Sequence, residues 1–367
     1  MWADNKKYLL INDCIGTKNL NTVGQRFILH LHNHPFFKLV ALGASSRSAG
    51  QPYIKATRWK QSKPIPESVK DVIIKECTTE NFKDCDIVFS GLDHDVAGPI
   101  ESGLREAQVA VFSNAKNYRR DPLVPLVVPL INTDHYKIIP AQQEPLGLKK
   151  GYIVANANCS TTALVVPLAA LEKSFGPLEL VQATTLQAIS GSGYPGLPSL
   201  DILDNVVPYI GSEEDKMEWE TYKILGGINP DMKSFEYHQA SPLKVSASCN
   251  RVPVIDGHMV CASVKFASPN KPTPEQVMEA FKNYKCDAQS VGAPSAPAQV
   301  ITVHEEEDRP QPRLDRDHQN GAGVNVGRVR EDSIFDIKFV VLANNVQIGA
   351  ATSSVMNAEV AALQGYV

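Results

Sequence analysis

The chain passes from strand to helix at Ala155-Asn156-Ala157-Asn158-Cys159-Ser160-Thr161-Thr162-Ala163-Leu164. Residues 151–155 form a short apolar run at its start, and apolar residues recur at helical spacing from 164 to 171 after it. Cys159 is therefore expected in the first turn of a helix, where unpaired amide groups and the helix dipole favour a thiolate over a thiol. A free cysteine is often only a small buried hydrophobe, but the polar residues around Cys159 indicate a nucleophile.

Length and composition indicate a two-domain globular protein. At 367 residues the chain is long for one hydrophobic core, and 43% hydrophobic with 21% charged residues is ordinary for this class. A net charge of -4 gives no electrostatic basis for binding nucleic acid or an anionic membrane. No apolar run reaches the ~20 residues of a membrane span, and the first residues lack a signal-peptide core. Seven scattered cysteines without a CxxC pair suit reduced thiols in a cytoplasmic enzyme.

The N-terminal residues have the pattern of a nucleotide-binding sheet. Residues 7–12 and 38–42 are expected to form strands, and residues 22–32 a helix between them. Strand, helix, strand opens a doubly wound sheet, in which the residues beyond the second strand meet the adenosine ribose. Ser45-Ser46-Arg47 occupy that place, and an arginine with hydroxyls there accommodates a 2′-phosphate, so they indicate NADP rather than NAD. A solvated surface loop is the alternative reading of these three residues.

The loop between the first strand and its helix is unusual for such a site. Glycines are expected there, because only a residue without a Cβ lets the backbone approach the pyrophosphate closely. Residues 16–24 carry glycine only at their two ends, and Lys18-Asn19-Leu20-Asn21 lie between them. Either the cofactor is held differently, or its binding is weakened, or residues 1–21 come from a misread gene boundary.

The sheet pattern continues with two more expected strands, at 86–90 and 109–112, and a helix at 100–107 between them. The loops after these strands lie at the carboxyl ends of parallel strands, where ligands bind in open α/β sheets. Lys116 and Arg119 in the second loop are candidates for binding an anionic substrate group. A solvated basic turn is the alternative.

The residues after Cys159 have the composition of a substrate-binding domain. A long strand is expected at 178–188, with Gln187 near its end. A helix at 213–225 would place Glu220 and Lys223 on one face, since the two are three residues apart. A surface salt bridge is the common alternative for such a pair.

Two later segments, 245–254 and 258–266, are expected to pair as a hairpin around a short turn. Arg251 and His258 flank that turn. A lone histidine beside a turn is more often structural unless a nucleophile needs a partner. Cys159 is such a nucleophile, but sequence spacing alone does not place His258 beside it.

Four motifs stand out along the chain: Asn158-Cys159-Ser160-Thr161-Thr162, Gln187-Ala188-Ile189-Ser190-Gly191-Ser192-Gly193-Tyr194-Pro195-Gly196, Glu220-Thr221-Tyr222-Lys223-Ile224-Leu225-Gly226 and Arg251-Val252-Pro253-Val254-Ile255-Asp256-Gly257-His258. Residues 45–50 and 113–119 fit the same pattern. Together they resemble the aspartate-semialdehyde dehydrogenase family, especially its fungal form, from about Val23 to Glu359.

This resemblance implies an α/β fold of two domains. Residues 1–157 and 345–367 would form an NADP-binding, Rossmann-type doubly wound domain, completed by a C-terminal helix near 347–364. Residues 158–344 would form an α+β catalytic and dimerisation domain, in a homodimer or homotetramer. The implied reaction is the NADPH-dependent reductive dephosphorylation of L-4-aspartyl phosphate to L-aspartate 4-semialdehyde, a step in methionine, threonine, lysine and isoleucine biosynthesis.

The resemblance also implies the role of each motif residue. Cys159 would attack the acyl phosphate to give a thioester, His258 would be the general acid and base, and Gln187 would orient the acyl intermediate. The implied substrate-binding residues are Arg251 for the α-carboxylate, Glu220 for the ammonium, Lys223 and Arg119 for the phosphate, and Asn114 and Lys116 near them. The implied cofactor-binding residues are Thr22, Val23, Ser45, Ser46, Arg47, Ser90, Gly91, Ser190, Gly191 and Asn345.

Two segments depart from the family pattern, and both are expected on the cofactor side. Residues 18–21 replace the glycine-rich loop, and residues 348–353 replace an arginine followed by Gly-Ala-Ala-Gly-Gly. The alternative is therefore a diverged homologue with weakened or lost NADP binding, acting in non-redox cysteine and histidine chemistry or as a non-catalytic partner subunit. No metal site is expected, because His30, His32 and His34 would splay apart on a helix.

Overall fold

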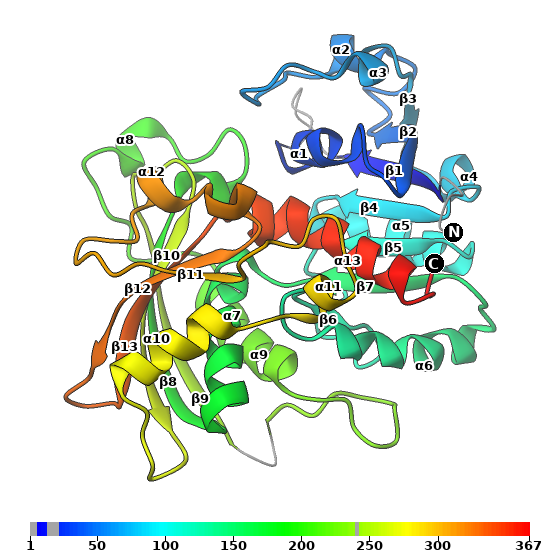
Figure 1. The fold of residues 1–367 in the computed structure, drawn as a ribbon. Coiled ribbons are helices and arrows are strands. Elements are labelled where there is room, and N and C mark those ends of the chain that lie inside the picture. Colours follow the sequence, from blue (N-terminus) through cyan, green and yellow to red (C-terminus); the bar gives the residue numbers. More distant parts are fainter. Residues whose placement is uncertain (1–5, 13–21, 239–241) are drawn as a thin grey trace.

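The computed structural model describes residues 6–12, 22–238 and 242–367. The expected phosphate loop, with Lys18 to Asn21, lies outside the described residues. Figure 1 shows two sheets side by side, one built from the N-terminal part of the chain and one from the C-terminal part. This confirms the expected α/β fold with a doubly wound sheet and a second, mixed sheet.

The first sheet is parallel throughout its described strands, in the order β3-β2-β1-β4-β5-β7-β6. The order runs outward in both directions from the neighbours β1 and β4, so a switch point lies between them, as in doubly wound nucleotide-binding folds. The strands expected from the sequence are present, with ends within two residues of those expected. The bounds are β1 (Lys6–Asn12), β2 (Phe37–Ala44), β3 (Ile74–Glu76), β4 (Ile87–Gly91), β5 (Ala110–Ser113), β6 (Leu126–Val127) and β7 (Tyr152–Asn156).

The helices of this part differ from expectation at one place. The helix expected at 100–107 begins earlier, at His94, and carries Pro99 inside it. The missing amide of Pro99 removes one hydrogen bond without ending the helix. The bounds are α1 (Thr22–Leu31), α2 (Tyr53–Ala56), α3 (Glu67–Lys70), α4 (Thr79–Phe82), α5 (His94–Glu106), η1 (Thr133–Ile138), α6 (Ile139–Gln143) and η2 (Glu144–Leu146).

The C-terminal segment returns to the first sheet. A π-helical turn, η5 (Gln347–Ala351), leads into α13 (Thr352–Leu363), which packs on β4, β5, β7 and α1. Residues 352–362 of α13 are all buried. The long red helix in Figure 1 therefore closes one face of a sheet formed by much earlier residues.

The second sheet is mixed, in the order β11-β12-β13-β10-β8-β9. The expected hairpin of 245–254 with 258–266 is wrong, because β8 lies between β9 and β10 and pairs with both. β9 runs parallel to β8 and β10 antiparallel to it, so the link between them crosses the end of β8 instead of making a tight turn. The bounds are β8 (Leu178–Gln187), β9 (Lys244–Arg251), β10 (His258–Phe266), β11 (Ile301–Val303), β12 (Val324–Glu331) and β13 (Ile337–Ala343).

Helix α7 (Cys159–Phe175) connects the two sheets. It begins just after β7 of the first sheet and packs on β8, β10 and β13 of the second. The expected helix at 213–225 is present with those bounds as α9 (Glu213–Leu225), which packs on α7 and β9. The remaining helices are η3 (Ile189–Ser192), α8 (Ser199–Ile202), α10 (Pro274–Asn283), α11 (Asp287–Ser290), α12 (Pro312–Asp315) and η4 (His318–Gly321).

One acidic residue is buried at the carboxyl ends of the parallel strands. Glu101 of α5 is fully buried, and its Oε1 accepts hydrogen bonds from Ser90 Oγ at 2.6 Å and Ser113 Oγ at 2.7 Å. Its Oε2 has no hydrogen-bond partner. Burial raises the pKa of Glu101 to about 7, although both hydroxyls oppose the shift. The folded state therefore favours the neutral carboxylic acid below about pH 7.

We expect Glu101→Gln to raise the free energy of unfolding at pH 8 by more than it does at pH 5. Because folding raises the pKa of Glu101, its contribution to stability is full below pH ~4.5 and is lost as pH rises through about 7. Glutamine keeps the acceptor for both serines and cannot ionise, so the gain at pH 8 should be ~2–3 kcal/mol. Thermal melting at the two pH values measures it, with the exposed Glu106→Gln as control. An equal effect at both pH values would contradict the prediction.

Candidate active site

Cys159 is the first residue of α7 and is partly exposed. The side chain of Asn158 caps this helix, since its Oδ1 accepts from the amides of Ser160 at 2.9 Å and Thr161 at 3.2 Å. The amide of Asn158 itself donates to Glu220 Oε2 at 2.7 Å. The backbone on both sides of the cysteine is therefore held by buried polar groups.

The state of the thiol differs from the sequence-based expectation of a thiolate. Although Cys159 opens partly to a pocket, protein surrounds most of its thiol, and this burial raises its pKa to about 12. The charge of Glu213 adds to the rise, and Arg251 and Arg119 oppose it. The amides that were expected to favour a thiolate bond to the Asn158 side chain instead. Cys159 is accordingly a neutral thiol at neutral pH in this structure.

A pocket of about 240 Å³ extends from the first residues of α1 to Cys159. Ends of elements from both halves of the fold meet at it. The residues that line it are Thr22, Val23, Gly91, Leu92, Asn114, Arg119, Ala157, Asn158, Cys159, Ser190, Gly191, Gly193, Asn345, Val346, Gly349 and Ala350. Many of the predicted site residues are thus brought together around one cavity.

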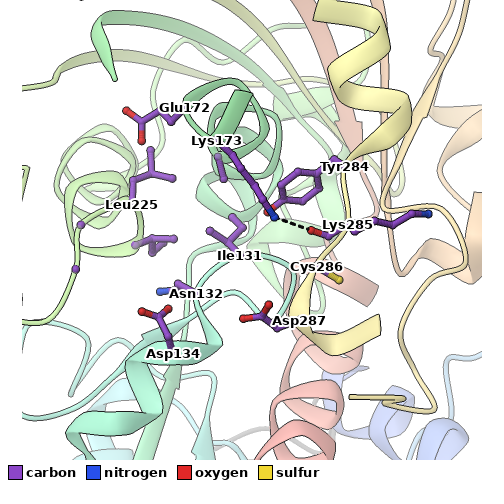
Figure 2. Close-up of a pocket in the computed structure, with 14 residues that line it drawn as sticks. Ile131, Asn132, Asp134, Glu172, Lys173, Leu225, Tyr284, Lys285, Cys286 and Asp287 are labelled. Carbon is purple, nitrogen blue, oxygen red and sulfur yellow. Dashed lines mark hydrogen bonds between the residues drawn. The ribbon is translucent and has the colours of Figure 1, made fainter. Parts of the chain in front are cut away.

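A second pocket, of about 350 Å³, lies near the other end of α7 (Figure 2). Lys173 and Tyr284 border it, and Lys173 Nζ donates to the carbonyl of Lys285 at 3.4 Å. Its described lining residues include none of the predicted site residues. The pocket at Cys159 is therefore the candidate active site.

At two glycines in the pocket, the missing Cβ lets other residues lie close to the backbone. A Cβ on Gly349, in η5, would lie 2.8 Å from the Cβ of Cys159. A Cβ on Gly191, in η3, would lie 2.7 Å from Arg251 Nη1 and 2.9 Å from His258 Nε2. His258 and Arg251 therefore lie directly behind Gly191, which itself faces the pocket that Cys159 lines.

His258 is fully buried, and its tautomer follows from one hydrogen bond. The amide of Ala188 donates to Nδ1 at 3.0 Å, so Nδ1 must be an acceptor. Burial, with Arg251 nearby, lowers the pKa of His258 to about 3, so the ring is neutral. Its hydrogen therefore resides on Nε2, which has no hydrogen-bond partner. In this state Nε2 can donate a hydrogen bond but cannot take a proton from the thiol, unlike the general base expected from the sequence.

Glu220 and Lys223 do not face the pocket as substrate-binding groups would. Both are fully buried. Glu220 Oε1 accepts from Arg119 Nη1 at 2.8 Å, while its Oε2 holds the amide of Asn158. Lys223 Nζ donates to the carbonyls of residues 119, 121 and 124 at 2.8, 2.8 and 2.9 Å. Burial lowers the pKa of Lys223 to about 7, but three acceptors use all three hydrogens of an ammonium and stabilise that charged form.

Arg119 is the cation that lines the pocket beside Cys159. Glu220 holds its Nη1, and Nη2 donates to the carbonyl of Asn114 at 3.0 Å. Its buried Nε has no hydrogen-bond partner. Asn114 lines the same pocket, whereas Lys116 is exposed and is not among the lining residues.

Gln187 and Arg251 are buried beside the pocket at the ends of β8 and β9. Gln187 Nε2 donates to Glu213 Oε1 at 3.4 Å, and Arg251 Nη1 donates to the carbonyl of Ala188 at 2.7 Å. Burial lowers the pKa of Arg251, whereas electrostatic interactions with Cys159 and Glu213 raise it. Both side chains are thus fixed by neighbouring groups around the cysteine.

The structure places the predicted cofactor residues in three different positions. Lining the pocket are Thr22, Val23, Gly91, Ser190, Gly191 and Asn345, with Asn345 Nδ2 donating to Ser190 Oγ at 2.9 Å. Ser45, Ser46 and Arg47 lie beyond the carboxyl end of β2, as expected, with Ser46 and Arg47 exposed. Ser90 is different, because its hydroxyl donates to buried Glu101.

Sequence reasoning missed three residues of the site: Asn158 as the helix cap, Glu213 as a buried carboxylate, and Gly349 as the contact on Cys159. The Asn-Cys-Ser run at the start of an expected helix was a signal for the cap. Glu213 resembles its exposed neighbours in sequence, and only burial distinguishes it. Gly349 is recognisable only from the close approach of η5 to α7.

The histidines considered for metal binding have other partners. His30 Nε2 lies 2.6 Å from Gln347 Oε1, and His34 Nε2 lies 2.7 Å from Glu359 Oε1. One group with metal-ligating atoms occurs among the described residues, namely His304, Asp315 and His318. Arg309 pairs with Asp315 through two hydrogen bonds, which makes this group an ion-pair cluster.

Comparisons with known proteins point to one family. Residues 21–139 match the semialdehyde dehydrogenase NAD binding domain, and residues 168–348 match the semialdehyde dehydrogenase dimerisation domain. Aspartate-semialdehyde dehydrogenase of Cryptococcus neoformans is 62% identical over 94% of this chain and 95% of its own. That of Saccharomyces cerevisiae is 53% identical over 92% and 94%. The crystal structure of aspartate semialdehyde dehydrogenase with NADP from Candida albicans has a TM-score of 0.90 and 50% identity, covering 99% of this chain and 100% of that one.

We expect Gly349→Ala to lower kcat for aspartate semialdehyde ~100-fold. The new Cβ would lie 2.8 Å from that of Cys159, so the thiol must move, and misplacement by ~1 Å costs about this much. Steady-state kinetics measures the loss. Gly227→Ala is the control, because a Cβ at residue 227 meets nothing within 4 Å. Wild-type turnover by Gly349→Ala would show that the contact does not position Cys159.

Proposed function

Because the chain belongs to the aspartate-semialdehyde dehydrogenase family, we propose that Cys159 is the nucleophile that forms its thioester intermediate. The chain is an NADP-dependent oxidoreductase for the reductive dephosphorylation of L-4-aspartyl phosphate to L-aspartate 4-semialdehyde. The observation that carries the residue assignments is the single pocket joining the start of α1 to Cys159. One end suits a cofactor phosphate and the other an acyl group.

The first chemical step uses Cys159 and the anion-binding groups around it. The sulfur attacks the acyl carbon, the bond from that carbon to the phosphate oxygen breaks, and phosphate leaves. Arg119, which lines the pocket together with Cys159, would hold the phosphoryl group. Because His258 carries its hydrogen on Nε2, the thiol proton would leave with the phosphate, whose oxygens can accept it. Asn114 would orient that phosphate, with Lys116 outside the pocket.

His258 would act on the carbonyl oxygen. Negative charge develops there when the sulfur attacks and again when the thioester is reduced. The Nε2 hydrogen of neutral His258 is a buried donor without a partner, and it would stabilise that charge. A role as base would need the other tautomer, with loss of the hydrogen bond from Ala188.

Arg251 and Gln187 would orient the acyl group. Arg251 offers a planar guanidinium behind Gly191 for the α-carboxylate, and Gln187 lies at the end of β8 beside it. Glu220 and Lys223 would act indirectly, because they hold Arg119 and the loop that follows it. This differs from direct contacts with the substrate ammonium and phosphate, because Lys223 already donates all three hydrogens and Glu220 is fully buried and paired with Arg119.

The residues present fit NADP. The start of α1 offers amide groups and the positive helix end for phosphate, and Gly91 and Gly349 line the same pocket. Ser45, Ser46 and Arg47 follow β2, where the 2′-phosphate would lie. When bound, NADPH supplies the hydride that reduces the thioester. The non-redox and partner-subunit alternatives are not favoured, because relatives at 52–62% identity are dehydrogenases.

The organisation of the enzyme is proposed from the same fold. Residues 1–157 with 345–367 would form the NADP-binding domain, and residues 158–344 the catalytic and dimerisation domain, consistent with the sheets and with α13 packing on the first. A homodimer or homotetramer is proposed from the matched dimerisation domain. Among the described residues, none of the helices is long and apolar enough to cross a bilayer. A cytoplasmic location is proposed from the unpaired cysteines.

We expect Cys159→Ala to reduce turnover at least ~1000-fold while leaving NADPH binding unchanged, since alanine removes only the nucleophile. The assay is phosphate-dependent oxidation of aspartate semialdehyde, with cofactor titration by fluorescence in parallel. The exposed Cys261→Ala is the control. Substantial residual turnover in Cys159→Ala would remove the nucleophile assignment.

We expect Arg47→Ala to lower the ratio of kcat/KM for NADPH to that for NADH ~10-fold or more. A charge-assisted hydrogen bond to the 2′-phosphate would be lost, and NADH does not carry that group. Lys55→Ala changes another exposed cation near the same loop and should leave the ratio unchanged. A ratio unaltered by Arg47→Ala would reject the role of Arg47.

A further inference from the structure

Glu213 is a buried carboxylate at the site to which the proposed chemistry gives no role. It is the first residue of α9 and is 5% exposed, whereas Glu214 and Asp215 beside it are exposed. Its Oε1 accepts from Asn158 Nδ2 at 2.8 Å and lies 3.4 Å from the donor Gln187 Nε2. Lys216 Nζ donates to its Oε2 at 3.1 Å. Amide donors from two other elements therefore converge on one acceptor.

These contacts connect Glu213 to the segments that carry the reacting groups. Asn158 caps α7 at Cys159, so the carboxylate holds the cap in place. Gln187 precedes Ala188, whose amide sets the tautomer of His258 and whose carbonyl holds Arg251. A displacement of Glu213 would thus also displace Cys159, His258 and Arg251.

The charge of Glu213 also acts on the thiol. It disfavours ionisation of Cys159, in opposition to Arg251 and Arg119. Lys216 is the cation paired with Glu213, and its side chain is 23% exposed. Solvent therefore screens Lys216, so that it offsets the charge of Glu213 only in part. The field at Cys159 therefore depends on a carboxylate that does not react.

We propose that Glu213 is a positioning residue that fixes Asn158 and Gln187 around Cys159. Its charge adds to the burial that disfavours ionisation of the thiol, and a neutral thiol is protected from oxidation because the thiolate is the reactive species. The inference rests on the proposed function only in taking Cys159 as the nucleophile.

The test is the pH dependence of Cys159 alkylation by iodoacetamide, followed by mass spectrometry of the peptide that contains it. Glu213→Gln keeps the size and one acceptor oxygen but removes the charge. We expect its alkylation rate at pH 7.5 to rise ~10-fold with the profile shifted to lower pH, while kcat falls ~10-fold and the KM for NADP is unchanged. Asp215→Asn, an exposed change in the same helical turn, is the control.

A second variant gives an expectation of opposite sign. Lys216→Met removes the cation beside Glu213, so the carboxylate acts on the thiol without compensation and alkylation should slow ~2–3-fold. Lys216 is partly exposed, so this variant also tests the proposal if Glu213→Gln does not fold. An unshifted profile in Glu213→Gln, or faster alkylation in Lys216→Met, would overturn the proposal. Alkylation needs no substrate, so these results stay separate from a failure of the proposed reaction.

Discussion

The cap that Asn158 makes at the start of α7 is the interaction on which the site depends. Its side chain satisfies two amides of the first turn, its backbone amide is held by Glu220, and its side-chain amide by Glu213. Buried polar groups are stable only when they are paired, so these contacts fix one backbone path into the helix. Cys159 is the next residue, so its backbone position is fixed by the same contacts. The two carboxylates, Glu213 and Glu220, both belong to α9, so this helix supports the start of α7 and the proposed nucleophile.

Close approach of backbone segments completes the arrangement around the cysteine. Gly349 lets η5 pass against Cys159, and Gly191 lets η3 cover Arg251 and His258. These segments come from distant parts of the chain, and α13 draws the end of the chain back onto the first sheet. The pocket therefore exists only where both sheets and the C-terminal helix meet. Its chemistry combines a neutral thiol, a neutral histidine with an unpartnered donor, and buried guanidinium groups.

The sequence predicted much of the fold because the local patterns were strong. Apolar periodicity located α7, an acidic segment was correctly expected as the helix α9, and the alternation of strands and helices predicted the parallel sheet. The expected hairpin of β9 with β10 was wrong, because strand propensity does not reveal that β8 lies between them. Lys223 was assigned to the substrate by resemblance, and its three carbonyl partners become visible only in three dimensions.

By itself, the sequence determined the family and the dinucleotide-binding sheet and indicated Cys159 as the proposed nucleophile, because motif residues and periodicity are local properties of the chain. Tertiary structure alone decided the protonation of that nucleophile and of its histidine. Burial and the charges of Glu213, Arg251 and Arg119 act on Cys159 through space, and one amide of Ala188 sets which nitrogen of His258 carries hydrogen. Such effects depend on distances between residues far apart in sequence, which residue order does not contain.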